Sequence, residues 1–230
     1  IYKKPQFGIK ECIIDGKEHK ISKRTIRKDT FCHLQHFTKP QFEQKQPKLL
    51  IIAPMSGHHA TLLRGTVQDT LPFFDVYITD WVDANQIPIT DGSFDLDDLI
   101  DYVINYINLL GPNVHVLAVC QPTVPVLAAT AIMSAENDPN IAKSMILIGG
   151  PIDARKNPTT PNDFAIDRNL EWFDKTLITN VPYNYPGYRR RVYPGFLQLS
   201  GFMTMNLQNH VTSHVNLFKN LLVEDDTEAE

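Results

Sequence analysis

The chain has 230 residues, of which 43% are apolar and 21% charged, and its formal net charge is −4. This composition is ordinary for a globular protein, and the length allows one domain with a full hydrophobic core, or a domain with an insertion. The acidic balance and the lack of a stripe rich in Lys and Arg argue against nucleic-acid binding. No signal peptide and no apolar run of about 18 residues is recognisable, so we expect no membrane span.

The cysteine count bears on the redox compartment. Cys12, Cys32 and Cys120 form no C-x-x-C pair and leave one thiol unpaired in any disulfide scheme. This favours a reducing compartment. The chain begins at Ile1 and ends in the acidic run 224–230, a pattern expected of a fragment of a longer protein and equally of a natural acidic tail.

The first third of the chain predicts strands. Residues 7–14 and 17–21 flank an Asp-Gly pair, which is a strong signal for a hairpin turn. Residues 31–37 alternate and predict a third strand. Cys12 and Cys32 lie within these strands, and their simplest role is packing in the core.

A continuous apolar run at 49–54 predicts a strand in the middle of a sheet covered on both faces. It leads through a glycine-containing turn, which includes Ser56 and Gly57, into a helix over 60–71. The turn either supplies a backbone N–H to an anion or needs its glycine for backbone angles alone. His58 and His59 follow the glycine, but the sequence places no further ligand at metal-binding spacing, so we do not predict a metal site there.

The next elements alternate between strand and helix. Residues 75–81 predict a second core strand with Asp80 at its carboxyl end, the edge where open α/β sheets bind ligands. Residues 96–110 have apolar positions at helical spacing and end at a Gly-Pro stop signal. Residues 144–151 predict another buried strand, and this order implies a parallel sheet with right-handed crossovers.

Between that helix and the last strand, residues 114–125 predict a buried strand that runs directly into a helix, with Cys120 at the junction. Ala118 and Pro122 give the pattern small-x-nucleophile-x-small, which occupies the place of the G-x-S-x-G nucleophile elbow of α/β-hydrolases. A thiol suits this position because sulfur is intrinsically nucleophilic and gains from the positive end of the helix it opens. The pattern alone does not exclude a cysteine that serves as a small apolar core residue.

From residue 155 onward prolines and aromatic residues dominate, and we expect short helices at most. An insertion at this point is typical of a lid or cap with an apolar inner face. Asp153 is favoured as a surface or capping residue, and the three arginines at 189–191 as a solvated turn. His210 and His214 lack a third ligand and are favoured as residues of a helix surface.

Five stretches together resemble one family, the intracellular poly(3-hydroxybutyrate) depolymerases, which are polyester hydrolases of the α/β-hydrolase fold with a cysteine nucleophile. The resemblance runs from about Phe7 to the end of the chain. The stretches that carry it are APMSGHHATLLR at 53–64, DVYITDWVDA at 75–84, AVCQPTVP at 118–125, GGPIDAR at 149–155 and RVYPGFLQ at 191–198.

The resemblance implies a fold and a domain organisation. The fold class is α/β, an incomplete α/β-hydrolase fold with a mostly parallel sheet, a β-rich N-terminal hairpin and a cap or lid insertion. Residues 1–154 would form the N-terminal part of the hydrolase core and 155–230 the cap, with the C-terminal part of the core absent from this chain. The triad acid and histidine are then expected beyond the position of Glu230, so the resemblance predicts little or no turnover by the chain as given.

The resemblance also implies an activity. Cys120 would attack the ester carbonyl of the storage polyester, and the backbone N–H groups of Gln121 and Ser56 would form the oxyanion hole. Water would release the thioester, or coenzyme A would accept the acyl group, without a cofactor or a metal ion. The implied place of work is the cytoplasm, at the surface of polyester granules.

Two other functions stay open on the sequence. A polyhydroxyalkanoate synthase-like acyltransferase also uses an elbow cysteine, although the small residues that flank Cys120 depart from the glycine-flanked form expected of synthases. A non-catalytic granule-binding protein that kept the fold is the second. The sequence does not determine the oligomeric state or the preferred polymer chain length.

Overall fold

The computed structural model describes residues 4–205, 212, 215–216 and 219. Its centre is a six-stranded sheet with the order β3-β4-β6-β5-β7-β8. Neighbouring strands are parallel from β6 to β8, whereas β3 and β4 are antiparallel at the other edge. These strands are β3 (Ser22–Lys28), β4 (Cys32–Thr38), β5 (Lys48–Ile52), β6 (Asp75–Trp81), β7 (His115–Val119) and β8 (Ser144–Ile148).

The middle of the sheet confirms the expectation from the continuous apolar run. β5 lies between β6 and β7, and Leu50, Ile51 and Ile52 are fully buried. Each such side chain contributes about 2 kcal/mol of hydrophobic stabilisation. The carboxyl ends of β5, β6 and β7 therefore meet at one rigid edge of the sheet, which is the edge that carries the candidate site.

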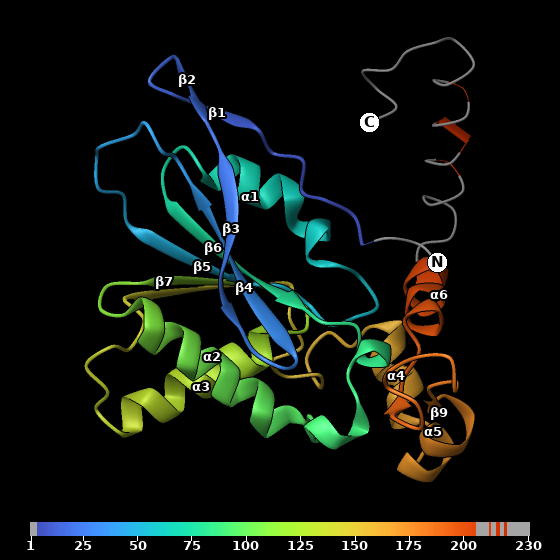
Figure 1. Ribbon diagram of the computed structural model, residues 1–230. Coiled ribbons are helices and arrows are strands. Elements are labelled where there is room, and N and C mark those ends of the chain that lie inside the picture. Colours follow the sequence, from blue (N-terminus) through green and yellow to red (C-terminus); the bar gives the residue numbers. More distant parts are fainter. Residues whose placement is uncertain (1–3, 206–211, 213–214, 217–218, 220–230) are drawn as a thin grey trace.

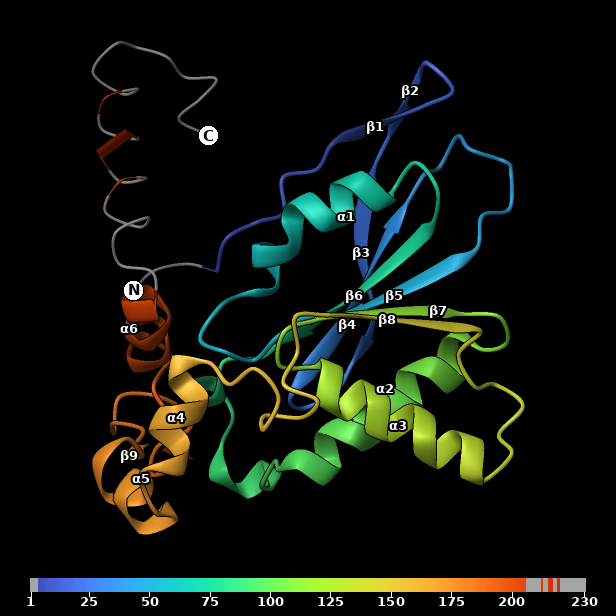
Figure 2. The same ribbon diagram turned by 180° about the vertical axis from the view of Figure 1, so that it is seen from behind.

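Helices cover both faces of this sheet, α1 on one side and α2 and α3 on the other (Figures 1 and 2). The helix predicted over 60–71 is a 3-10 turn, η1 (Ala60–Leu63), continued by α1 (Arg64–Thr70). The helix predicted over 96–110 is confirmed as α2 (Leu96–Leu110), which Asp95 and Asp98 begin with a capping box. The helix after Cys120 is α3 (Thr123–Ala135).

The N-terminal hairpin is confirmed as β1 (Glu11–Ile14) paired with β2 (Lys17–Lys20). Asp15 and Gly16 between them have φ values of 50° and 74°, the positive angles that a tight hairpin turn requires. The strand β3, which the sequence did not predict, is polar and almost wholly exposed. An edge strand needs no apolar face of its own, because its backbone pairs with β4.

The last strand of the sheet corrects one expectation. We predicted residues 144–151 as a buried strand, but β8 lies at an edge of the sheet, and Ile146 and Ile148 are 46% and 48% exposed. The apolar run includes side chains that face α3, such as Met145, which packs against the core. An apolar sequence alone does not reveal whether a neighbour covers the other face.

The segment after residue 155 forms short elements that lie to one side of the sheet in both views (Figures 1 and 2). One of its helices, α6, is longer than expected, because it has 11 residues. His210 and His214 lie outside the described residues. The described elements are α4 (Thr160–Ile166), α5 (Leu170–Thr176), β9 (Thr179–Asn180), β10 (Arg191–Val192) and α6 (Gly195–Met205).

Candidate active site at the Cys120 elbow

Cys120 lies in the single sharp turn that joins β7 to α3, with a backbone φ of 67°. A non-glycine residue rarely adopts this left-handed conformation, and it persists only where the surroundings hold it. Three hydrogen bonds do so: Cys120 N–H donates to Ile148 O at 2.8 Å, and Cys120 O accepts from the N–H and the Oγ1 of Thr123 at 3.2 and 2.8 Å. Cys120 is partly exposed, so the turn holds a cysteine that is not sealed in the core at the carboxyl edge of the sheet.

The elbow is also packed tightly from the side of β8. Thr123 is fully buried, and a Cβ added to Gly150 would lie 1.6 Å from its Oγ1. Ala118 at the end of β7 is fully buried as well. The small residues around the elbow therefore have a steric role, because larger side chains would displace the backbone that holds Cys120.

The loop after β5 lies against the elbow. Met55 N–H donates to the side-chain Oε1 of Gln121 at 2.7 Å, so this loop is hydrogen-bonded directly to the residue that follows Cys120. Ser56 is buried. Among the described residues no backbone carbonyl accepts from the N–H of Gln121 or of Ser56. Met55 is a third amide in this place that sequence reasoning did not name.

Gly57, the glycine of the same loop, has a φ of 81°, and a Cβ there would lie 2.6 Å from Gly195 O. The glycine is needed both for its backbone angle and for the close approach of α6. His58 and His59 follow it, and burial together with the neighbouring His59 lowers the pKa of His58. No group of three or more potential metal ligands occurs in the described part of the chain.

A cavity of about 840 Å³ opens beside this loop. It lies between the loops that follow β5 and β6 and the segment around β10, and its size is that of a small-molecule site. Its wall combines apolar and aromatic residues with His58, His59 and the arginines at 189–191. Cys120 is not among the residues that form it, and Met55 links the cavity to the elbow. Wall residues include Met55, Trp81, Ile89, Phe94, Val192 and Tyr193.

The arginines at 189–191 correct a second expectation, because they do not form a uniformly solvated turn. Arg190 is 9% exposed and donates to the carbonyls of Ile87, Pro88 and Gly92 at 3.0, 2.6 and 2.8 Å. A guanidinium has five donors in a rigid fork, which suits three converging carbonyls. Arg190 thus fastens the C-terminal segment to the loop of two short 3-10 turns, η2 (Ala84–Gln86) and η3 (Ile89–Asp91).

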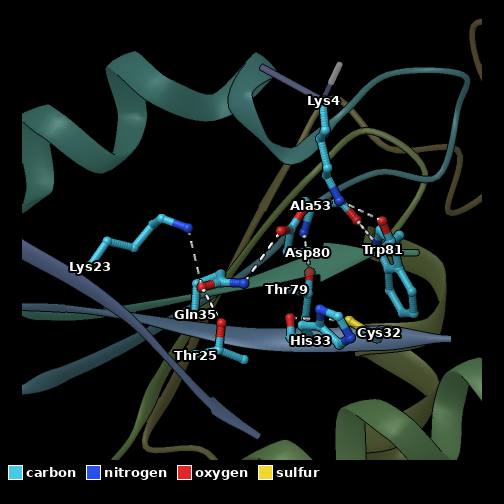
Figure 3. Close-up of polar contacts among 10 residues, drawn as sticks. All are labelled: Lys4, Lys23, Thr25, Cys32, His33, Gln35, Ala53, Thr79, Asp80 and Trp81. Carbon is cyan, nitrogen blue, oxygen red and sulfur yellow. Dashed lines mark hydrogen bonds and ion pairs between the residues drawn. The ribbon is translucent and has the colours of Figure 1, made fainter. Parts of the chain in front are cut away.

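Two carboxylates named from the sequence have local partners. Asp153 accepts from the Arg155 N–H and guanidinium at 3.1 and 2.8 Å, and these hydrogen bonds lower its pKa. Asp80 forms an ion pair with Lys4 at 2.6 Å and accepts from Gln35 at 3.3 Å (Figure 3). Asp153 therefore has the surface role expected of it, and Asp80 is part of a polar network that joins the N-terminal segment to the sheet.

A mostly parallel sheet, helices on both faces and a left-handed turn at Cys120 above the carboxyl edge are features of an α/β-hydrolase fold. Residues 149–230 match the family model of the PHB de-polymerase C-terminus. Over this range the chain is similar to that family. Two of the five stretches that carry the resemblance lie within the matched range, at 149–155 and 191–198.

Comparison with solved structures found three hydrolytic enzymes among the similar chains. The N-formylmaleamic acid deformylase of Pseudomonas putida is 16% identical over 68% of this chain and 55% of its own, with a TM-score of 0.44. A putative lipase from Acinetobacter baumannii is 14% identical over 71% and 56%, with a TM-score of 0.42. A membrane phospholipase A described as a bacterial virulence factor is 16% identical over 82% and 61%, with a TM-score of 0.43.

This chain thus spans between about half and three fifths of the length of those three structures. A search of curated protein sequences found no match. Of the helices that the structure describes, none is long and apolar enough to cross a membrane.

Proposed function

We propose that this chain carries the nucleophile and the oxyanion site of a polyester hydrolase that acts on poly(3-hydroxybutyrate). The observation that carries the proposal is the left-handed backbone of Cys120 at the junction of β7 and α3, with a partly exposed thiol. A turn of this kind costs about 1–2 kcal/mol, and a packing role for the cysteine gives no reason to maintain it. The match of residues 149–230 to the PHB depolymerase family supports the substrate.

The chemistry is acyl transfer through a thioester. The Cys120 thiolate forms a bond to the ester carbonyl carbon, and the carbonyl oxygen becomes an oxyanion that accepts hydrogen bonds from the backbone N–H groups of Gln121 and Ser56. The intermediate collapses as the C–O bond breaks and the alcohol end of the polymer leaves with a proton. Water then releases a carboxylic acid and regenerates the thiol, or coenzyme A takes the acyl group as a thioester.

The substrate class follows from the cavity and the resemblance. The apolar and aromatic part of the cavity wall suits a short aliphatic acyl chain. The polymer is water-insoluble, so the proposal includes work at the surface of cytoplasmic polyester granules. It assigns no general base among the described residues, so we expect acylation of Cys120 to be detectable while turnover stays low.

Acylation is therefore the step to measure. The chain is mixed with p-nitrophenyl 3-hydroxybutyrate, quenched in acid, and analysed by intact mass and peptide mapping. We expect one acyl group on Cys120 and release of one equivalent of p-nitrophenol. Cys120→Ala is expected to remain unmodified, and the Cys12→Ala and Cys32→Ala variants, which keep the elbow, serve as matched controls.

The proposal is wrong if the acyl group appears on Cys12 or Cys32, or if no acylation occurs in a chain whose Cys120 reacts normally with iodoacetamide. In the second case the granule-binding alternative gains, and binding of the chain to amorphous polymer granules tests it. Steady release of 3-hydroxybutyrate from granules by this chain alone would contradict the expected low turnover.

A further inference from the structure

The main chain of Ala53, the first residue after β5, is held by two side chains of the neighbouring strand β6 (Figure 3). Ala53 N–H donates to Thr79 Oγ1 at 2.8 Å, and Ala53 O accepts from Trp81 Nε1 at 2.7 Å. All three residues are buried, Thr79 completely. Both main-chain polar groups of Ala53, which belong to two successive peptide units, are therefore satisfied by buried side chains.

These bonds take over where the sheet ends. The backbone pairing of β5 with β6 stops at Ile51 and Ile78. Thr79 and Trp81 are two residues apart on β6, so their side chains lie on the same face of the sheet. Their hydrogen bonds attach β5 to β6 beyond the last backbone pair, at Ala53, where the chain leaves the sheet and enters the loop.

Ala53 lies only two residues before Met55. Pro54 between them has a fixed φ, which removes one of the backbone rotations between Ala53 and the Met55 amide. Met55 N–H is the amide that reaches the Gln121 side chain at 2.7 Å. A shift of Ala53 would therefore move the amides of Met55 and Ser56 relative to Cys120.

Trp81 is itself held on several sides. Its carbonyl accepts from Lys4 Nζ at 2.8 Å, and its ring lies 5.9 Å from the ring of Phe94 and 6.3 Å from that of Tyr102. The same residue contributes to the wall of the cavity beside Met55. The Trp81 side chain thus lines the cavity and also binds the main chain of Ala53, which precedes the loop with the proposed oxyanion donor.

We propose that Thr79 and Trp81 are positioning residues that set the Ser56 oxyanion donor through the main chain of Ala53. The proposal rests on the proposed function, because it needs an oxyanion to form at Cys120. Oxyanion donors must lie within a few tenths of an ångström of their hydrogen-bonding distance to be effective, so a support of this kind has a direct catalytic consequence.

The test compares two reactions of the same thiol. Acylation of Cys120 by p-nitrophenyl 3-hydroxybutyrate develops an oxyanion, whereas alkylation of Cys120 by iodoacetamide does not. Thr79→Val keeps the shape of the side chain and removes the acceptor, and Thr79→Ser keeps the hydroxyl. Trp81→Phe removes the indole donor. Val103→Ala, at a buried position of α2, is the control for a general loss of stability.

For Thr79→Val we expect acylation to slow by about 10-fold to 100-fold, while alkylation stays within about 2-fold of the unsubstituted chain. Thr79→Ser should restore acylation to within about 3-fold, and Trp81→Phe should slow acylation alone. Val103→Ala should leave both rates unchanged at a temperature where it is folded.

The inference is overturned if Thr79→Val acylates at the rate of the unsubstituted chain, or if acylation and alkylation fall together. Failure of Thr79→Ser to restore acylation also counts against it. Loss of the proposed function gives a different result, because the unsubstituted chain would then show no acylation of Cys120 at all, and both proposals would be withdrawn.

Discussion

Two cysteines of this chain lie at the ends of strands in the same sheet and have opposite surroundings. Cys32 begins β4, is fully buried, and its Sγ donates to the backbone of His33 at 3.6 Å. Burial raises the pKa of the Cys32 thiol to about 12. Cys120 follows β7, has a positive φ, and is partly exposed at the edge where the loop after β5 meets the elbow.

The difference teaches that backbone conformation and exposure, not residue type, decide what a thiol can do. A thiol must ionise and reach its target to act as a nucleophile, and burial prevents both at Cys32. Cys32 fills space in the core, whereas Cys120 lies in a left-handed turn and is partly exposed. Four predictions test this contrast, from the largest effect to the smallest.

The largest effect is expected on acylation. Cys120→Ala should lower acylation by p-nitrophenyl 3-hydroxybutyrate by at least about 10⁴-fold, because the attacking atom is gone. Cys32→Ala should acylate normally and lose about 1–2 kcal/mol of stability to the small cavity it creates. Stopped-flow release of p-nitrophenol and urea unfolding measure the two quantities. Equal acylation by both variants would remove the distinction between the two cysteines.

Alkylation by iodoacetamide compares the accessibility of Cys120 and Cys32 without a substrate. Cys32 reacts only when the core opens, so under native conditions we expect Cys120 to be labelled at least about 10³-fold faster. Peptide mapping after timed quenches gives both rates in one sample. Urea at a concentration that unfolds the chain is the control, and there the two rates should converge. A similar native rate at both sites would mean that Cys32 is accessible.

The packing around the elbow is tested by two adjacent glycines. Gly150→Ala places a methyl group against Thr123, the residue whose N–H and Oγ1 hold the Cys120 carbonyl. We expect a loss of about 2–3 kcal/mol from overpacking. Gly149→Ala has open space around its Cβ but a φ of 60°, so only backbone strain of about 1 kcal/mol is expected. Urea midpoints measure both, and the reverse order would show that the Gly150 contact relaxes freely.

The smallest effect concerns the strain itself. Glycine tolerates a positive φ and alanine does not, so Cys120→Gly should be about 1 kcal/mol more stable than Cys120→Ala. At Cys32, where the backbone belongs to a regular strand, Cys32→Gly should instead be less stable than Cys32→Ala. Thermal unfolding of the four variants measures this. A glycine penalty at both sites would show that the elbow is not strained.

Much of the fold was readable because it depends on local patterns. The Asp-Gly turn, the helix α2 with its Gly-Pro stop and the apolar strand β5 occur where the sequence indicated. The strand β3 escaped prediction because its exposed polar residues carry no periodic signal. β8 was expected to be buried, since an apolar run does not say how many of its faces are covered.

The site divides in the same way. The pattern around Cys120 marked the elbow, and the glycine-containing turn marked the loop beside it. Thr79 and Trp81 gave no signal, because a side chain that binds the backbone of another strand is recognised only when the strands are paired. Arg190 was expected in a solvated turn, and its three carbonyl partners lie about 100 residues away along the chain. No local pattern records such a contact.

By itself the sequence determined most of the strands and helices of the central sheet and the place of a thiol at one of their junctions, because hydrophobic periodicity and turn residues act over a few neighbours. The tertiary structure decided which amides lie beside that thiol, which arginine is buried and which strand is left at an edge. These properties depend on residues distant in the chain, brought together by the pairing of β5 with β6 and β7.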